Sequence, residues 1–219
     1  MARTDTLGHF LTDVADAIRT KTGSSATIQA SSFDTAISNI SGGGLDWSAI
    51  GYSGEPQDII DGYNYAKTIY DNWDSTLTSM NAKYDKNNNL VFMPLVNTSN
   101  ITDMYAAFRQ CYRLITIPLL NTSNVSEFRY IFKGCYALAN IPQFNISSAS
   151  RLENMFTDCY SLTDTSLDNI LKMCISNSSY SRTKTLAALG FASANYPSSR
   201  IQALPSYQDF INAGWTIGY

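Results

Sequence analysis

Charged side chains are scarce in this 219-residue chain. Asp, Glu, Lys and Arg supply 15% of the residues, against about a quarter in an average soluble domain. The formal net charge is −3 and the isoelectric point lies near 5.0. A nucleic-acid-binding protein needs a basic surface to neutralise phosphates. The composition therefore predicts a partner other than nucleic acid.

Histidine is also nearly absent, which limits the catalytic chemistry. His9 is the single histidine, so a Ser-His-Asp arrangement or a site with several histidine ligands is not expected. The motifs G-x-x-x-x-G-K-[ST], G-x-G-x-x-G and G-x-S-x-G do not occur, and no spacing positions a pair of carboxylates. The sequence predicts a protein that is not an enzyme and that uses no cofactor.

Long apolar runs are missing too. The longest, Leu90–Val96 and Ile117–Leu120 with their neighbours, are far shorter than the roughly 20 residues that a membrane-spanning helix needs. The first residues lead directly into a polar, amphipathic segment rather than a secretory signal. Neither membrane insertion nor export through such a signal is expected.

An internal repeat dominates what is present. Residues 97–120, 121–144 and 145–168 align without a gap at a period of 24 residues. Four columns recur in all three segments, with Phe108, Phe132 and Phe156 in the first, Cys111, Cys135 and Cys159 in the second, Tyr112, Tyr136 and Tyr160 in the third, and Leu114, Leu138 and Leu162 in the fourth. The preceding segment from Leu90 to Pro94 fits the same frame.

Each repeat is predicted to form one turn of a solenoid. Apolar residues three and four apart predict short helical stretches at Ile101–Gln110, Val125–Gly134 and Leu152–Asp158. A short extended piece follows the Cys-Tyr pair, as in Leu114–Ile117 and Leu138–Ile141. One repeat alone cannot bury its apolar face, whereas stacked repeats form a continuous core.

The pattern F-x-x-C-Y-x-L-x-x-I-P resembles the BspA-like leucine-rich repeats of bacterial and phage surface proteins. Phe108–Pro118 and Phe132–Pro142 match it, and Phe156–Leu162 is a degraded third copy. The resemblance covers roughly half the chain. Together, period and resemblance predict an α/β fold, a right-handed leucine-rich-repeat solenoid of roughly four to five turns with a cap at each end.

A separate helical module is predicted at residues 1–40. It consists of two amphipathic helices whose apolar faces carry Phe10, Leu11, Val14, Ile18, Phe33, Ile37 and Ile40. Forty residues are too few for a stable core, so these faces are expected to serve attachment or oligomerisation. The module resembles the N-terminal region of tail-associated proteins from phages of Gram-positive bacteria, which implies docking to other virion or tail proteins.

The segments between and after these parts are predicted to cap the solenoid. Residues 41–44 form a glycine-rich linker, and residues 45–96 form the N-terminal cap and a first degenerate repeat. A helix is expected within Pro56–Trp73. Residues 169–219 are expected to hold an irregular last repeat and the C-terminal cap, with helices near Leu167–Cys174 and Ser206–Ala213.

Three periodic residue types invite functional interpretations. The cysteines contain no C-x-x-C pair, so buried free thiols are favoured over a metal site or a disulfide between turns. Asparagines in N-x-S/T triplets, at positions 97, 100, 121, 124 and 145, are expected to satisfy turn backbone groups rather than carry glycans. Tyr112, Tyr136 and Tyr160 would form either a recognition surface for a protein or sugar, or a simple cover over the solenoid edge.

The predicted function is recognition without catalysis. The resemblances imply a phage tail or baseplate component, located in the virion, whose solenoid contacts a host cell-surface protein or glycan. A homo-oligomer held by the N-terminal module would add avidity. A structural virion protein that acts as a decoration or spike subunit, and a bacterial surface or secreted adhesin, remain alternatives.

Overall fold

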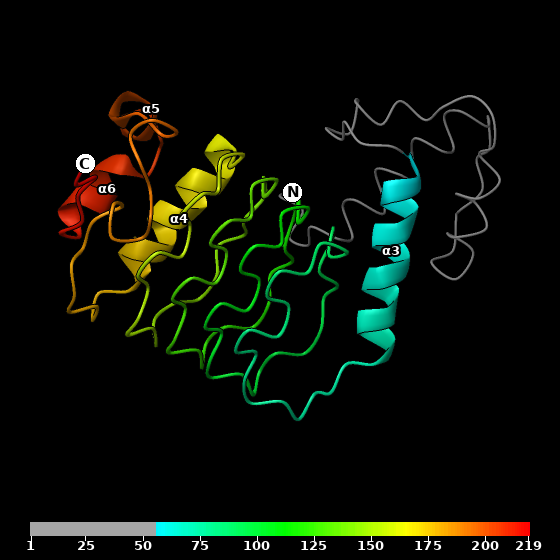
Figure 1. Cartoon of the computed structure of the whole chain (residues 1–219). Coiled ribbons are helices and arrows are strands. Elements are labelled where there is room, and N and C mark those ends of the chain that lie inside the picture. The colour runs from blue at the N-terminus through cyan, green and yellow to red at the C-terminus, as the bar shows by residue number, and fades with distance from the viewer. Residues whose placement is uncertain (1–55) are drawn as a thin grey trace, which may run out of the picture.

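The computed structural model describes the backbone of residues 56–219 and the side chains of residues 61–219. The predicted attachment module, with Phe10, Leu11, Val14, Ile18, Phe33, Ile37 and Ile40, lies outside the described residues, as does the glycine linker. The helices in chain order are α3 (Pro56–Asp71), α4 (Asp164–Ser176), α5 (Ser198–Gln202) and α6 (Tyr207–Asn212). Figure 1 shows α3 at one end of a series of stacked turns and α5 and α6 at the other.

Parallel bridges between residues 24 apart hold the turns together. One row joins Ser79 to Asp103, then Glu127, then Arg151, and a second joins Phe92 to Thr116, then Asn140. Both rows begin one turn before the three aligned segments. Residues 73–96 therefore form a complete first turn in the same register, where the sequence had indicated only a degenerate repeat.

The predicted helical stretches Ile101–Gln110, Val125–Gly134 and Leu152–Asp158 are wrong, because these segments form consecutive tight turns. In the first of them, N–H groups bond to carbonyls three residues earlier, as from Ala107 to Met104 and from Arg109 to Ala106. The intervening N–H groups donate to the next turn of the stack, from Ala106 to Arg129 and from Phe108 to Ile131. The backbone thus bonds between turns instead of along a helix axis.

Residues with left-handed backbone conformations produce these tight turns. Ala106, Tyr130 and Asn154 share one column with φ of 51°, 59° and 60°, and Gln110, Gly134 and Asp158 share another with φ of 57°, 79° and 61°. Only Gly134 adopts such a conformation without a steric cost. Ala106, Tyr130, Asn154 and Gln110 are held there by backbone N–H bonds to the part of the chain stacked on them, at the carbonyls of Arg129, Glu153, Ala188 and Lys133.

Ladders of identical side chains fill the interior. The rings of Tyr84, Phe108, Phe132 and Phe156 stack in one row with centroids 5.6, 5.6 and 5.9 Å apart. Phe108, Phe132 and Phe156 are fully buried, and so are the leucines at 114, 138 and 162. Stacking places the apolar faces of successive turns in contact, so each turn completes the core of its neighbour.

The helix α3 covers the first turn, as the predicted helix within Pro56–Trp73 required. Ala66 packs against Val91 and Phe92. A Cβ atom on Gly62 would lie 2.7 Å from that of Val91, so glycine permits the close approach of helix and turn. Asn87 stands in the cysteine column of the first turn and donates a hydrogen bond of 2.6 Å to the Tyr65 hydroxyl.

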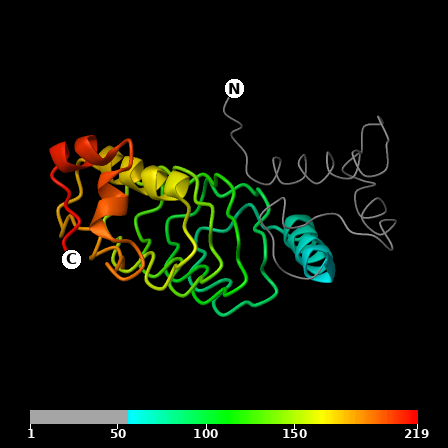
Figure 2. The same ribbon diagram turned by 90° about the horizontal axis from the view of Figure 1, so that it is seen from above.

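The C-terminal part closes the other end. The helix α4 interrupts the repeat and lies along one side of the stack (Figure 2), where the Asn177 amide donates to the carbonyls of Ile146 and Ala149. A last bridge joins Thr185 to Thr216. The helices predicted near Leu167–Cys174 and Ser206–Ala213 correspond to α4 and α6. None of the helices described in residues 56–219 is long and apolar enough to span a membrane.

Candidate functional site

The cysteine column lies inside the stack. Cys111, Cys135 and Cys159 are buried free thiols, and so is Cys174. Each of the first three donates from Sγ to a carbonyl 27 residues earlier, those of Tyr84, Phe108 and Phe132, over 2.9, 2.9 and 3.1 Å. Among the described residues no group of three His, Cys, Asp or Glu side chains could hold a metal ion. The structure therefore places these thiols in the core, bonded to backbone.

The four thiols are expected to resist alkylation while the protein is folded. Burial raises the pKa of the Cys111 thiol to about 12 and raises those of Cys135, Cys159 and Cys174 as well, and the thiolate is the reactive form. Because the folded-state pKa lies above the ordinary value of 9.0, the free energy of unfolding should fall as pH rises past that value. Rapid maleimide labelling of native protein at pH 8, at the rate seen in urea, would contradict this.

The periodic asparagines bond to turn backbone, as predicted. The side chains of Asn97, Asn121 and Asn145 accept from the backbone N–H two residues on, at 3.0, 3.2 and 3.0 Å. Asn100 and Asn124 donate to the carbonyls of Ser75 and Ser99 on the preceding turn. These amides satisfy turn backbone groups and link neighbouring turns.

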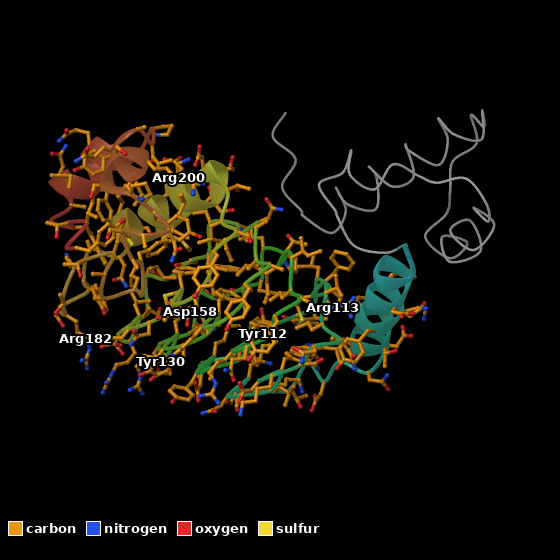
Figure 3. All side chains as sticks on the ribbon, turned by 45° about the horizontal axis from the view of Figure 1, so that its top comes forward. Tyr112, Arg113, Tyr130, Asp158, Arg182 and Arg200 are labelled. Carbon is orange, nitrogen blue, oxygen red and sulfur yellow. The ribbon has the colours of Figure 1, made fainter. Side chains whose placement is uncertain are left out.

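The tyrosine column forms a continuous row on the outside of the stack. Tyr112 and Tyr136 stack with ring centroids 4.9 Å apart at an interplanar angle of 23°, and Tyr136 and Tyr160 at 5.4 Å and 13°. Tyr136 and Tyr160 are 45% and 49% exposed, and Tyr112 is half-buried. Figure 3 shows Tyr112 over the middle turns and Arg113 beside α3. The structure thus brings the three predicted tyrosines together at the surface.

Stacking determines which part of each ring can meet a ligand. Tyr136 has a ring against both of its faces and Tyr112 and Tyr160 against one each, so the tyrosine row presents mainly ring edges and hydroxyl groups to solvent. The Tyr160 hydroxyl donates to Asp158 over 2.8 Å, and this hydrogen bond raises the pKa of Tyr160. A sugar ring would need an open aromatic face, whereas a protein surface can use edges and hydroxyls.

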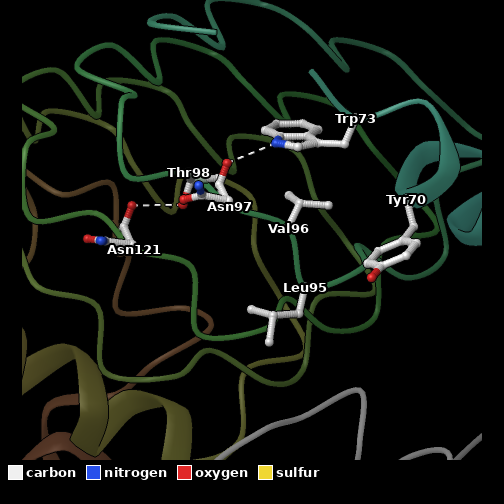
Figure 4. Close-up of a pocket in the computed structure, with 7 residues that line it drawn as sticks. All are labelled: Tyr70, Trp73, Leu95, Val96, Asn97, Thr98 and Asn121. Atoms are coloured by element: carbon white, nitrogen blue, oxygen red, sulfur yellow. Dashed lines mark hydrogen bonds between the residues drawn. The ribbon is translucent and has the colours of Figure 1, made fainter. Parts of the chain in front are cut away.

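A second exposed feature, which was not among the predicted sites, lies where α3 meets the first two turns. A hollow of about 580 Å³ is lined by Tyr70, Trp73, Leu95, Val96, Asn97, Thr98 and Asn121. Figure 4 shows Trp73 donating to the Asn97 carbonyl and Thr98 to that of Asn121, each over 2.8 Å. Tyr70 is 62% exposed and Leu95 is 47% exposed.

The hollow differs from a catalytic site in its chemistry. Tyr70 is its only lining side chain with a titratable group, and the side-chain donors of Trp73 and Thr98 are already bonded to backbone. One signal in the sequence could have indicated it. Leu95 and Leu119 each follow a proline at the repeat period, and both are exposed.

Of the comparisons with known proteins, one found a match, and it covers the region that the repeat occupies. No curated protein and no solved structure matches the chain. One family model matches residues 75–187, which run from the first stacked turn to the segment that follows α4. The match covers just over half of the chain, which therefore belongs to the family described as Mycoplasma protein of unknown function, DUF285.

Proposed function

We propose that this chain is a non-enzymatic recognition protein that binds another protein through the row formed by Tyr112, Tyr136 and Tyr160. The observation that carries the proposal is the outward stacking of these three rings in consecutive turns. Tyrosine combines apolar area with a hydrogen-bonding hydroxyl and is enriched where protein interfaces gain most of their energy.

The stack gives the row a fixed shape before any partner arrives. The cysteine next to each tyrosine is held in the core by its Sγ hydrogen bond, and each ring is braced by its neighbour in the row. Side chains that are ordered before binding lose less conformational entropy on association. Weak contacts from the three rings can therefore add up to a specific interaction with the partner protein.

The fold class and biological setting belong to the same proposal. The parallel bridges between residues 24 apart support a leucine-rich-repeat solenoid. The family supports it too, because it is associated with BspA-like repeat proteins. The resemblance of residues 1–40 to phage tail proteins supports a place in the virion, where several copies would contact a host surface protein with avidity.

Replacing Tyr136 by alanine is expected to weaken binding of the full chain to host cells by about tenfold or more, the effect of losing an aromatic interface anchor. Tyr136 is the best target because it touches a ring on both sides. Flow cytometry of fluorescently labelled protein on a panel of intact bacteria, including the natural host, measures the effect.

Tyr70→Ala is the matched control, because Tyr70 is exposed and lies outside the row. It should bind as the unaltered chain does. Equal binding by the unaltered chain and Tyr136→Ala would rule out the tyrosine row as the recognition surface. A chain that binds no cell in the panel, but assembles into particles, would favour a structural virion role instead.

A further inference from the structure

A polar hollow lies across the first three turns, separate from the tyrosine row. Its volume is about 420 Å³, and its lining residues are Lys86, Tyr105, Arg109, Gln110, Tyr130 and Lys133. Every one of these side chains carries a hydrogen-bond donor, and three carry a positive charge. No carboxylate contributes to the lining. We call this feature the basic hollow.

Most of its donors have no partner within residues 56–219. Lys86 and Lys133 form no ion pair there, and the hydroxyls of Tyr105 and Tyr130 make no hydrogen bond. Arg109 is held by Asp85 through Nε and Nη2, at 2.8 and 2.6 Å. That contact fixes the guanidinium and leaves its Nη1 atom unused by Asp85.

Nearby carboxylates do not neutralise the hollow. Asp85 is bound by Arg109, and Glu127 is bound by Arg129 at 2.7 Å. Each of these acids therefore balances an arginine, and the two lysine charges remain in excess. This concentration of positive charge stands out on a chain whose formal net charge is −3.

Cation–π contacts set the positions of the rings. Lys133 Nζ lies 5.6 Å from the centroid of Tyr130, and the Arg129 guanidinium lies 5.4 Å from that of Tyr105. The two rings also meet edge to face, with centroids 5.6 Å apart. With their faces so occupied, Tyr105 and Tyr130 offer hydroxyl groups rather than ring faces to a ligand.

The lysines are spaced along the stack. Lys86 belongs to the first turn and Lys133 to the third, with Arg109 and Gln110 between them. Backbones bonded in this way lie about 4.8 Å apart, so two steps separate the lysine backbones by about 10 Å. A ligand that meets both ammonium groups must therefore be elongated or carry more than one negative charge.

From this arrangement we infer that the basic hollow binds a polyanionic ligand whose phosphate or carboxylate groups contact Lys86, Arg109 and Lys133. Hydrogen bonds from a charged donor to a phosphate or carboxylate group are stronger than hydrogen bonds between neutral groups. The hydroxyls of Tyr105 and Tyr130 and the Gln110 amide would bond to the remaining oxygens. None of the three tyrosines of the outer row takes part, so this site is independent of the proposed recognition surface.

The test is calorimetric titration of the full chain with tripolyphosphate and, separately, with citrate, at low ionic strength. Lys86→Gln/Lys133→Gln is expected to weaken binding of the tighter probe by about tenfold or more. Added salt should weaken binding to the unaltered chain, because screening reduces attraction between exposed charges. The tighter probe identifies phosphate or carboxylate as the preferred group.

The matched control is Lys83→Gln/Lys184→Gln, which changes the net charge equally outside the hollow. It should bind within about twofold of the unaltered chain, since neither ammonium group lines the hollow or can contact the ligand there. Equal weakening by both double variants, or no binding of either probe to the unaltered chain, would overturn the inference.

Two further variants separate failure of this site from failure of the tyrosine row. Tyr136→Ala should keep full affinity for the probe, because its ring is not part of the lining. Tyr130→Phe removes one hydroxyl while keeping the ring, and it should weaken probe binding. Thermal unfolding of each variant shows that a lost signal reflects the site rather than the fold.

Discussion

Phe132→Ala is expected to lower the free energy of unfolding by about 3–5 kcal/mol, the range for deleting a buried phenylalanine ring. The Phe132 ring lies between those of Phe108 and Phe156, at 5.6 and 5.9 Å, and also contacts Phe144 at 6.3 Å. Removing it leaves a cavity that backbone bonds between turns on either side prevent from closing. Urea unfolding followed by circular dichroism measures the loss.

The control for this prediction lies in the same turn. Tyr136→Ala also removes an aromatic ring, but one that is 45% exposed, so it should cost well under half as much as Phe132→Ala. If the two substitutions were equally destabilising, the phenylalanine row would not be the stabilising core of the stack.

Trp215→Ala should have a comparable effect, about 3–5 kcal/mol, at the other end of the molecule. Trp215 is fully buried and stacks on Tyr180 at 5.5 Å and on Phe210 at 6.0 Å. The neighbouring Thr216 and Ile217 accept hydrogen bonds from Leu186 and Ala187 of the last turn. Losing the indole should therefore loosen that turn, which faster hydrogen exchange at Leu186 and Ala187 would reveal.

Trp215→Phe separates the contribution of ring packing from that of the indole N–H group. Among the described residues the buried Trp215 Nε1 atom has no hydrogen-bond partner. Phenylalanine removes this unpaired donor and keeps most of the apolar contact, so its cost should stay within about 1.5 kcal/mol. A loss as large as that of Trp215→Ala would contradict this and show that a phenyl ring does not replace the packing of the indole.

The columns of the repeat could be predicted because one apolar position per turn is a strong constraint. Phe108, Phe132 and Phe156 are identical because each touches its neighbours in the row. The first turn was harder to recognise, since Tyr84 stands in the phenylalanine column and Asn87 in the cysteine column. These departures follow from its position: within residues 56–219 no earlier turn offers a carbonyl to a thiol, and Asn87 bonds instead to Tyr65 of α3.

The error over the short helices also has a physical origin. Apolar residues three and four apart occur on a helix, but the consecutive turns bury Ile101, Met104 and Phe108 at the same spacing. The distinguishing signal is a left-handed residue at a fixed column, and at Ala106 and Tyr130 the sequence offers no glycine to reveal it. Only Gly134 marks the second left-handed column.

The tyrosine row and the basic hollow differ in how readily they can be predicted from the sequence. The tyrosine row repeats at 24 residues and could be predicted from the sequence. The basic hollow was harder to predict, because only Arg109 and Lys133 share a column, which Asp85 occupies in the first turn, and Lys86 stands one position later. Their proximity arises from backbone hydrogen bonds between neighbouring turns, which join Lys86 to Arg109 and Gln110 to Lys133.

The direction of the bonds between turns has a consequence for self-association. In the segment from Ala82 to Lys86, the bonds to the next turn run from an N–H of the first turn to a carbonyl of the second, as from Ala82 to Tyr105 and from Lys86 to Arg109. By the same register, the groups of this segment that point away from the second turn are the carbonyls of Asn81, Lys83 and Asp85. Two copies related by a two-fold axis would bring carbonyl against carbonyl there. Along this segment the polarity of the backbone thus disfavours symmetric edge-to-edge pairing, the common route by which exposed strands aggregate, and α3 packs against the same turn.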